Sequence, residues 1–162
     1  MSRLDSLIRR LEAQRACLNL VAEMIRDLPG PVLELGLGNG RTYDHLRETL
    51  PDREIFVFER AVAADPDCVP DAAHLLLGDI HETLPAAVER FGPSVALVHS
   101  DLGTGDAEVN GRLAAFLAAR LPGLLRPGGV VISDQEVGLA GAVALPLPAG
   151  VSPGRYFICR TP

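Results

Sequence analysis

The stretch that decides the fold is Val32-Leu33-Glu34-Leu35-Gly36-Leu37-Gly38-Asn39-Gly40-Arg41-Thr42, an apolar run followed by three glycines at alternate positions. Its first four residues, an apolar run broken by one carboxylate near its end, predict a short buried strand, because apolar runs are typical of strands covered on both faces. Residues 41–50 carry apolar or aromatic groups at helical spacing and predict a helix. A strand, a glycine turn and a helix start together predict a ligand site. Glycine lets a ligand approach the main chain, and the helix start offers unpaired N–H groups.

The acidic residue and the three glycines, E-x-G-x-G-x-G, resemble the first motif of class I S-adenosyl-L-methionine (SAM) methyltransferases. A dinucleotide fingerprint, G-x-G-x-x-G, would instead need its third glycine where Arg41 stands. The resemblance implies that Glu34 faces the methionine part of the cofactor and that the glycines let the cofactor approach the backbone. The cofactor-binding residues that it implies here are Glu34, Gly36, Leu37, Gly38, Asn39, Gly40 and Thr42.

The next two predicted strands each end beside an acidic residue. Residues 54–59 form an apolar run that closes on Glu59, followed by Arg60. An acid at this place accepts hydrogen bonds from ribose hydroxyls in dinucleotide and SAM folds, and a carboxylate has acceptors for both hydroxyls of a diol. Residues 74–80 predict a third strand and its exit. There Gly78, Asp79 and Ile80 resemble the motif of the family that binds the edge and face of adenine.

The exits of the fourth and fifth strands carry the candidates for chemistry. Val95 to Val98 predicts a central parallel strand, which leads into a loop at 99–106. Ligands bind at the carboxyl ends of strands in open α/β sheets, so His99 and Ser100 are expected to contact the cofactor. Residues 124–134 resemble the L-x-P-G-G turn of the family into its fifth strand. The candidate general bases are His99, Asp101 and Asp134.

The exits of the fourth and fifth strands also suggest a possible site for a divalent cation, but the residue types there do not favour it. Catechol-type O-methyltransferases place acids after the fourth strand and an Asp-Asn pair after the fifth. Here His99 stands at the first position and Asp134-Gln135 at the second. Because Mg²⁺ prefers oxygen ligands in compact geometry, we expect no metal site.

The remaining pattern completes an α/β fold. A helix is predicted over 3–28, with its apolar stripe packed on the sheet, and further helices over 83–91 and 107–125. Residues 142–147 and 155–160 predict a closing antiparallel hairpin, as the resemblance implies. The expectation is a single Rossmann-like three-layer domain over 1–162, with an N-terminal helix in 1–30 and the core in 31–160. Its sheet would be mostly parallel and seven-stranded.

Composition narrows the function classes. The net charge is −6 and all 15 basic residues are arginine, so Schiff-base chemistry and a phosphate-loop lysine are excluded and nucleic acid is disfavoured as a partner. The chain has no long apolar run and no signal-peptide pattern, and its three cysteines form no C-x-x-C pair. These features predict a cytoplasmic protein that does not bind a membrane.

The sequence therefore predicts a SAM-dependent methyltransferase that acts on a small-molecule acceptor. Two alternatives stay open. One is a non-catalytic SAM-binding subunit with a regulatory or partner role, since no sizeable insertion builds an acceptor pocket; the other, less favoured, is an NAD-dependent oxidoreductase. The N-terminal helix also offers a surface for a homo-oligomer or a lid beside the cofactor.

Overall fold

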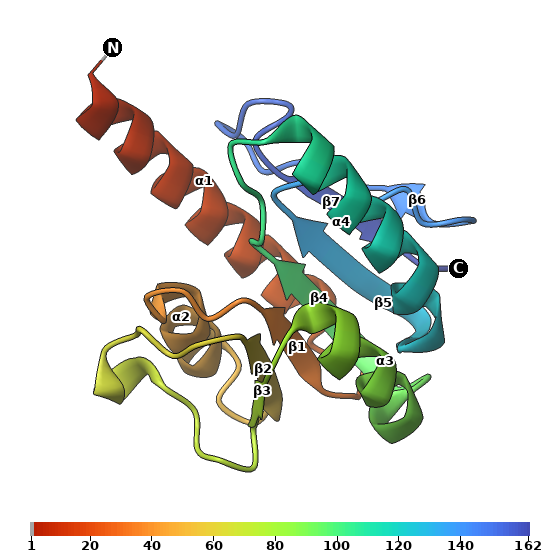
Figure 1. Ribbon diagram of the computed structural model, residues 1–162. Helices are drawn as coiled ribbons and strands as arrows, with labels where there is room; N and C mark the ends of the chain where they lie inside the picture. The colour runs from red at the N-terminus through yellow and green to blue at the C-terminus, as the bar shows by residue number, and fades with distance from the viewer. Residues whose placement is uncertain (1) are drawn as a thin grey trace.

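The computed structural model describes residues 2–162, in which a twisted seven-stranded sheet lies between two layers of helices (Figure 1). The strands are β1 Val32–Leu35, β2 Ile55–Glu59, β3 Leu75–Leu77, β4 Val95–Ser100, β5 Leu125–Ser133, β6 Val143–Ala144 and β7 Phe157–Arg160. The helices are α1 Arg3–Met24, α2 Arg41–Thr49, α3 Ile80–Phe91 and α4 Ala107–Arg120, with single 3₁₀ turns at Pro66–Cys68 and Leu121–Gly123.

The strand order is β3-β2-β1-β4-β5-β7-β6. Strands β1 to β5 are parallel, and β7 runs antiparallel to β5 and to β6. The order reverses between β1 and β4, so a crevice opens at their carboxyl ends, where ligands bind in such sheets. The predicted Rossmann-like fold with its antiparallel C-terminal hairpin is confirmed.

Both faces of the sheet are buried, which explains why its strands read as continuous apolar runs. Successive residues of β1 alternate between the two cores. Val32 packs with α1 and α2 on one face, and Leu33 packs with α3 and α4 on the other. The sheet therefore holds the ends of β1, β2 and β4 in fixed register, and these ends carry the predicted site.

The N-terminal helix begins where it was predicted, but it ends earlier and is covered only in part. Ser2 caps it in a capping box with Asp5, as expected, but the helix ends at Met24 rather than at residue 28. Its second half packs on the sheet through Cys17 and Val21, both fully buried. Its first turns extend beyond the body of the molecule (Figure 1), leaving three apolar side chains exposed: Leu4, Leu7 and Ile8. The prediction that the whole apolar stripe packs on the sheet is wrong for these turns.

Other boundaries also move for local reasons. Helix α4 ends at Arg120 rather than at residue 125, because a 3₁₀ turn that contains Pro122 follows it. Helix α3 begins at Ile80, three residues before the predicted start, because Asp79 caps its first turn. His99 and Ser100 belong to β4 and not to the loop after it. The β6 strand is only two residues long, so most of the predicted segment 142–147 is irregular.

Candidate functional site

The glycine turn between β1 and α2 is shaped by backbone angles that only glycine adopts readily. Gly38 has φ of +53° and Gly40 has φ of +82°. A Cβ at Gly40 would lie 2.5 Å from the Cβ of Cys68, whereas a Cβ at Gly38 would meet no atom within 4 Å. Gly40 is therefore required by packing, and Gly38 leaves open space above the turn.

Glu59 at the end of β2 holds this turn in place. Its Oε2 accepts the N–H groups of Leu37 and Gly38 at 2.9 and 3.0 Å, and its Oε1 accepts those of Arg60 and Ala61 at 2.7 and 3.2 Å. Burial alone raises the pKa of the Glu59 carboxyl, but these four hydrogen bonds outweigh it and hold the pKa below its ordinary value. The carboxylate is thus charged, and all four of its acceptor positions are occupied by backbone.

Two cavities meet over this turn and form one cleft along the carboxyl ends of the strands. One has a volume of about 310 Å³ and the other about 460 Å³, and both are lined by Gly36, Glu59 and Leu102. The predicted cofactor residues that line this cleft are Gly36, Leu37, Gly38, Asn39, Thr42, Glu59, Arg60, Gly78, Asp79 and Ile80. The sequence thus identified a set of residues that the fold brings together.

Asp79 lies at the far end of the cleft and caps α3. Its Oδ1 accepts the backbone N–H of His81 at 2.9 Å and also contacts Nδ1 of that histidine at 2.9 Å. These two hydrogen bonds lower the pKa of the Asp79 carboxyl. Both contacts use Oδ1, which leaves Oδ2 for a donor on a ligand.

Glu34, by contrast, lies below the cleft. Glu34 and His99 are both fully buried, and the pairing of β1 with β4 places them opposite each other. Oε2 of Glu34 is 2.6 Å from Nδ1 of His99, and Oε1 of Glu34 accepts the hydroxyl of Thr42 at the start of α2. The predicted contact of Glu34 with a cofactor stays a prediction. In this structure the carboxylate instead joins β1, β4 and α2.

The environment of His99 favours its protonated form. Burial lowers its pKa, but the charge and hydrogen bond of Glu34, together with the charges of Asp101 and Asp134, outweigh burial and raise the pKa above its ordinary value. Its Nε2 is buried without a hydrogen-bond partner among residues 2–162. His99 and Ser100 are buried at the end of β4 and do not line the cleft, and Gly40 lies behind the turn.

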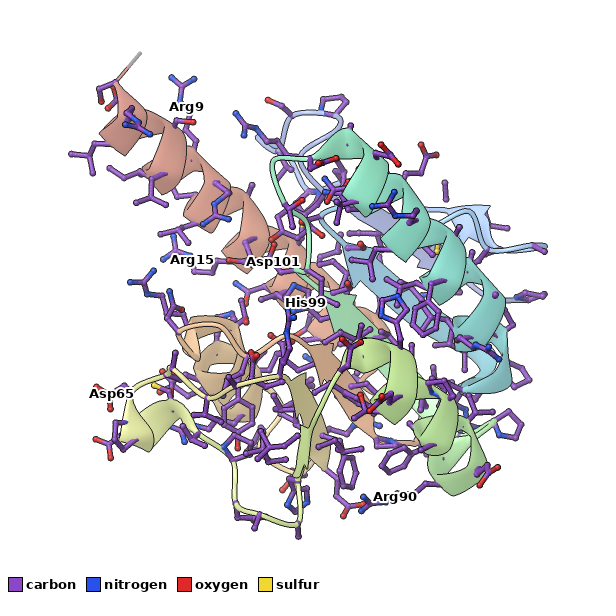
Figure 2. All side chains as sticks on the ribbon, in the orientation of Figure 1. Arg9, Arg15, Asp65, Arg90, His99 and Asp101 are labelled. Carbon is purple, nitrogen blue, oxygen red and sulfur yellow. The ribbon has the colours of Figure 1, made fainter. Side chains whose placement is uncertain are left out.

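Asp101 is the candidate base that lines the cleft. Its Oδ2 accepts a hydrogen bond of 2.8 Å from Nε2 of Gln14, a buried polar side chain of α1. Figure 2 shows Asp101 beside α1 and directly above His99. Sequence analysis missed Gln14, although a polar residue within the buried stripe of the helix was a usable signal.

Asp134 lies behind the loop that carries Asp101. Its Oδ2 accepts the N–H of Gly103 at 2.9 Å, and a Cβ at Gly103 would approach that oxygen to 2.0 Å. Burial and the charge of Asp101 raise the pKa of the Asp134 carboxyl above its ordinary value. Asp134 therefore supports the 101–103 loop, and a carboxyl so placed is a poorer candidate for direct contact with an acceptor.

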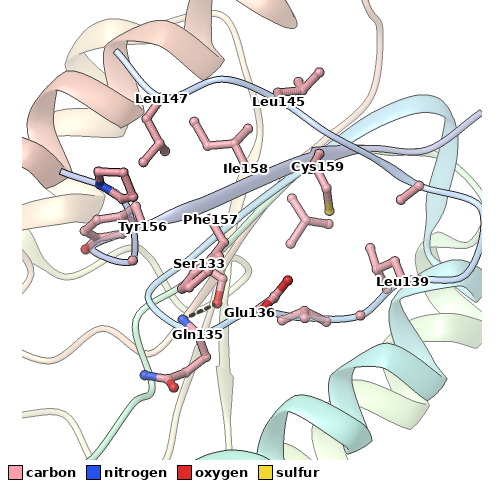
Figure 3. A pocket seen from close by; sticks show the side chains of 17 residues that line it. Ser133, Gln135, Glu136, Leu139, Leu145, Leu147, Tyr156, Phe157, Ile158 and Cys159 are labelled. Carbon is pink, nitrogen blue, oxygen red and sulfur yellow. Dashed lines mark hydrogen bonds between the residues drawn. The ribbon is translucent and has the colours of Figure 1, made fainter. Parts of the chain in front are cut away.

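A separate cavity of about 360 Å³ surrounds β7 and the 135–142 segment (Figure 3). It is mainly apolar, and Gln135 lies at one end, where its backbone N–H donates to the hydroxyl of Ser133 at 3.1 Å. It shares no lining residue with the cleft. Within residues 2–162, no group of three His, Cys, Asp or Glu side chains is arranged to hold a metal ion, and no helix has an apolar segment long enough to cross a membrane.

Comparisons with known proteins agree with this geometry. A family model described as S-adenosyl-L-methionine methyltransferase matches residues 1–161. The crystal structure of an S-adenosyl-L-methionine methyltransferase from Silicibacter pomeroyi DSS-3 is 50% identical. That match covers 100% of this chain and 99% of the other, with a TM-score of 0.93. No curated protein matches significantly.

More distant structures share the fold alone. The methyltransferase MycE of the mycinamycin biosynthetic pathway, in complex with Mg, SAH and mycinamycin VI, is 18% identical with a TM-score of 0.59, covering 94% of this chain and 48% of the other. The O-methyltransferase TomG from Streptomyces achromogenes, in complex with SAM, is 19% identical with a TM-score of 0.50, covering 72% and 53%. Nothing among these matches supports an oxidoreductase.

Proposed function

The chain belongs to the S-adenosyl-L-methionine methyltransferase family and is a SAM-dependent enzyme, and from that premise we propose that its cleft transfers the methyl group to a small-molecule acceptor. The observation that carries this proposal is the continuity of the cleft. It runs from Asp79, across Glu59 and the glycine turn, to Asp101. Its length and its acidic residues suit a ligand that carries adenine, ribose and an amino acid in a row.

The residues present fit the cofactor. The open space above Gly38 admits a ligand against the main chain, where a side chain would fill it. Oδ2 of Asp79 is available to the adenine amino group, and Ile80 beside it can pack on the ring. Glu59 lies between these ends and is placed for the ribose hydroxyls, which would compete with the N–H groups of Leu37 and Gly38 for its oxygens.

SAM supplies a methyl group on a positively charged sulfur. The sulfur–carbon bond breaks in line as an acceptor oxygen or nitrogen bonds to the methyl carbon, which leaves S-adenosylhomocysteine (SAH). The protein positions the two reactants and accepts the proton that the acceptor loses. We assign that proton to Asp101, because it lines the cleft and Gln14 fixes its orientation. Glu34 and His99 lie below the cleft, and the contact between them holds the ends of β1 and β4 together.

The test is calorimetric titration of the protein with SAH and, separately, with NAD, with and without Mg²⁺. Micromolar binding of SAH with no binding of NAD supports the proposal. Binding of NAD and not SAH contradicts it. A single domain over 1–162 and a homo-oligomer formed through α1 stay predictions, and analytical ultracentrifugation in the same buffer tests the second.

A further inference from the structure

A further cavity lies outside the cofactor cleft, in the groove between α1 and α2. Its volume is about 350 Å³, and its apolar lining comes from Ile8, Leu11 and Leu18 of α1. Ile8 is 45% exposed, although it is a large apolar residue on an ordered helix. A groove of this size and composition is typical of a small-molecule site.

The groove opens into the cofactor cleft. Leu11, Gln14, Arg41 and Thr42 line both cavities. Gln14 is also the side chain that donates to Asp101. A molecule bound in this α1–α2 groove therefore ends beside the proposed proton acceptor. The cavity around β7 has no such connection.

Three arginines gather at this junction of a protein with a net charge of −6, beside the carboxylates of Asp101 and Glu59 that line the adjoining cleft. Arg15 and Arg41 line the groove and Arg10 lines the adjoining cleft. Within residues 2–162, none of these three guanidinium groups pairs with a carboxylate, whereas Arg26, Arg47 and Arg112 do so elsewhere. Of the other two titratable groups in the groove, Glu12 makes no ion pair within the described chain and His45 bonds to Asn19 at 2.7 Å.

One ligand does not account for all three arginines. The cofactor has a single carboxylate, and one guanidinium is enough to bind it in a bidentate pair. Arg15 lines the groove and not the cofactor cleft, so it is free for a different anion. Figure 2 shows Arg15 on the side of α1 that faces α2, and Arg9 on the opposite side of the same helix.

We propose that the α1–α2 groove is the acceptor site and that the acceptor is an amphiphilic anion, with an apolar body and a carboxylate or phosphate group. This inference rests on the proposed methyltransferase function. The apolar body packs on Ile8, Leu11 and Leu18, and Arg15 binds the anionic group. The position to be methylated lies at the Gln14 end of the groove, next to the cleft.

The test uses two fluorescent probes of similar size in the presence of saturating SAH. 8-Anilinonaphthalene-1-sulfonate is an amphiphilic anion, and N-phenyl-1-naphthylamine is its uncharged counterpart. Arg15→Gln is expected to weaken binding of the anion about fivefold, the effect of losing one exposed ion pair, and to leave the neutral probe unchanged. Arg9→Gln is the matched control and changes neither. Displacement of the dye by decanoate and by decyl phosphate then distinguishes carboxylate from phosphate recognition.

A second pair of variants tests the apolar wall. Ile8→Asn is expected to weaken the binding of both probes. Leu4→Asn, on the same helix but outside the groove, is expected to leave the binding of both unchanged. Equal affinity of the anionic probe for Arg15→Gln and Arg9→Gln overturns the proposal. SAH titration of the same variants separates the two hypotheses. If the variants bind SAH as the unmodified protein does but none of them changes the dye affinity, only the proposed acceptor site is refuted. If the unmodified protein does not bind SAH, the proposed function itself is refuted.

Two further experiments on the same protein test whether a membrane surface or a second copy of the chain occupies the groove instead. Flotation of the protein with vesicles of phosphatidylcholine and phosphatidylglycerol would assign the apolar turns of α1 to a membrane surface. A dimer in ultracentrifugation that Ile8→Asn dissociates would place a second copy there. Either result overturns the proposal. Protein that stays in the aqueous phase and whose oligomeric state Ile8→Asn does not change supports it.

Discussion

Removing the carboxylate of Glu59 is the perturbation for which the structure gives the clearest magnitude. In the structure this carboxylate accepts four backbone N–H groups, two of them from the glycine turn. Ribose hydroxyls must therefore displace existing hydrogen bonds, so that binding gains only the difference. A hydrogen bond to a charged group contributes about 1.5–3 kcal/mol, and the exchange sets the expected loss at the lower end. Glu59→Ala should then weaken SAH binding by about 1.5 kcal/mol, or about tenfold.

The assay is calorimetric titration of SAH into the folded variant, with circular dichroism to verify the fold. Glu48→Ala is the control, because Glu48 is exposed on α2 and makes no side-chain hydrogen bond or ion pair within residues 2–162. The control should bind SAH as the unmodified protein does. An SAH affinity of folded Glu59→Ala within twofold of the unmodified protein would refute the placement of the ribose at Glu59.

Three further changes separate packing, charge and pH effects. Gly38→Ala should cost about 1–2 kcal/mol of stability in urea unfolding, the cost of a left-handed backbone. Gly40→Ala should cost more, because its Cβ also meets Cys68 at 2.5 Å; equal losses would contradict this. Below pH 6.5, where the raised pKa of His99 keeps its imidazole protonated, Glu34→Gln should cost about 3–5 kcal/mol, because it leaves that buried charge without its partner. A change below about 1 kcal/mol would show that His99 is neutral. The folded-state pKa of Asp134 lies above its ordinary value of 3.8, so its charge costs stability as pH rises through the window between the two values. Asp134→Asn should be more stable than the unmodified protein at neutral pH and lose that advantage below pH 3.8, and urea unfolding across this range would contradict the account if the order reversed.

The sequence predicted the parts of the site that depend on local backbone chemistry. Three alternating glycines after an apolar run favour a tight turn with positive φ, and the structure has that turn. Glu59 ends β2 and Asp79 lies two residues after the end of β3, so parallel pairing brings them to the same edge of the sheet. Their place on the cleft follows from topology, which the strand–helix alternation already indicated.

The contacts that sequence analysis missed join residues far apart in the chain. Glu34 meets His99 through the register of β1 with β4, and Gln14 meets Asp101 because α1 crosses the ends of the strands. Neither pairing follows from a periodic pattern. The exposure of the first turns of α1 was missed because the local pattern there is regular and misleading. Leu4 and Ile8 continue the apolar stripe, but the sheet ends before it can cover them.

The most direct test of the central claim is a crystal structure of the complex with SAH. The account predicts the adenine beside Asp79, the ribose hydroxyls at Glu59 and the amino-acid end over Gly38 toward Asp101. It also predicts that Glu34 stays bonded to His99 and that the α1–α2 groove stays free of the ligand. SAH bound in the groove or around β7, with the cleft empty, would contradict it.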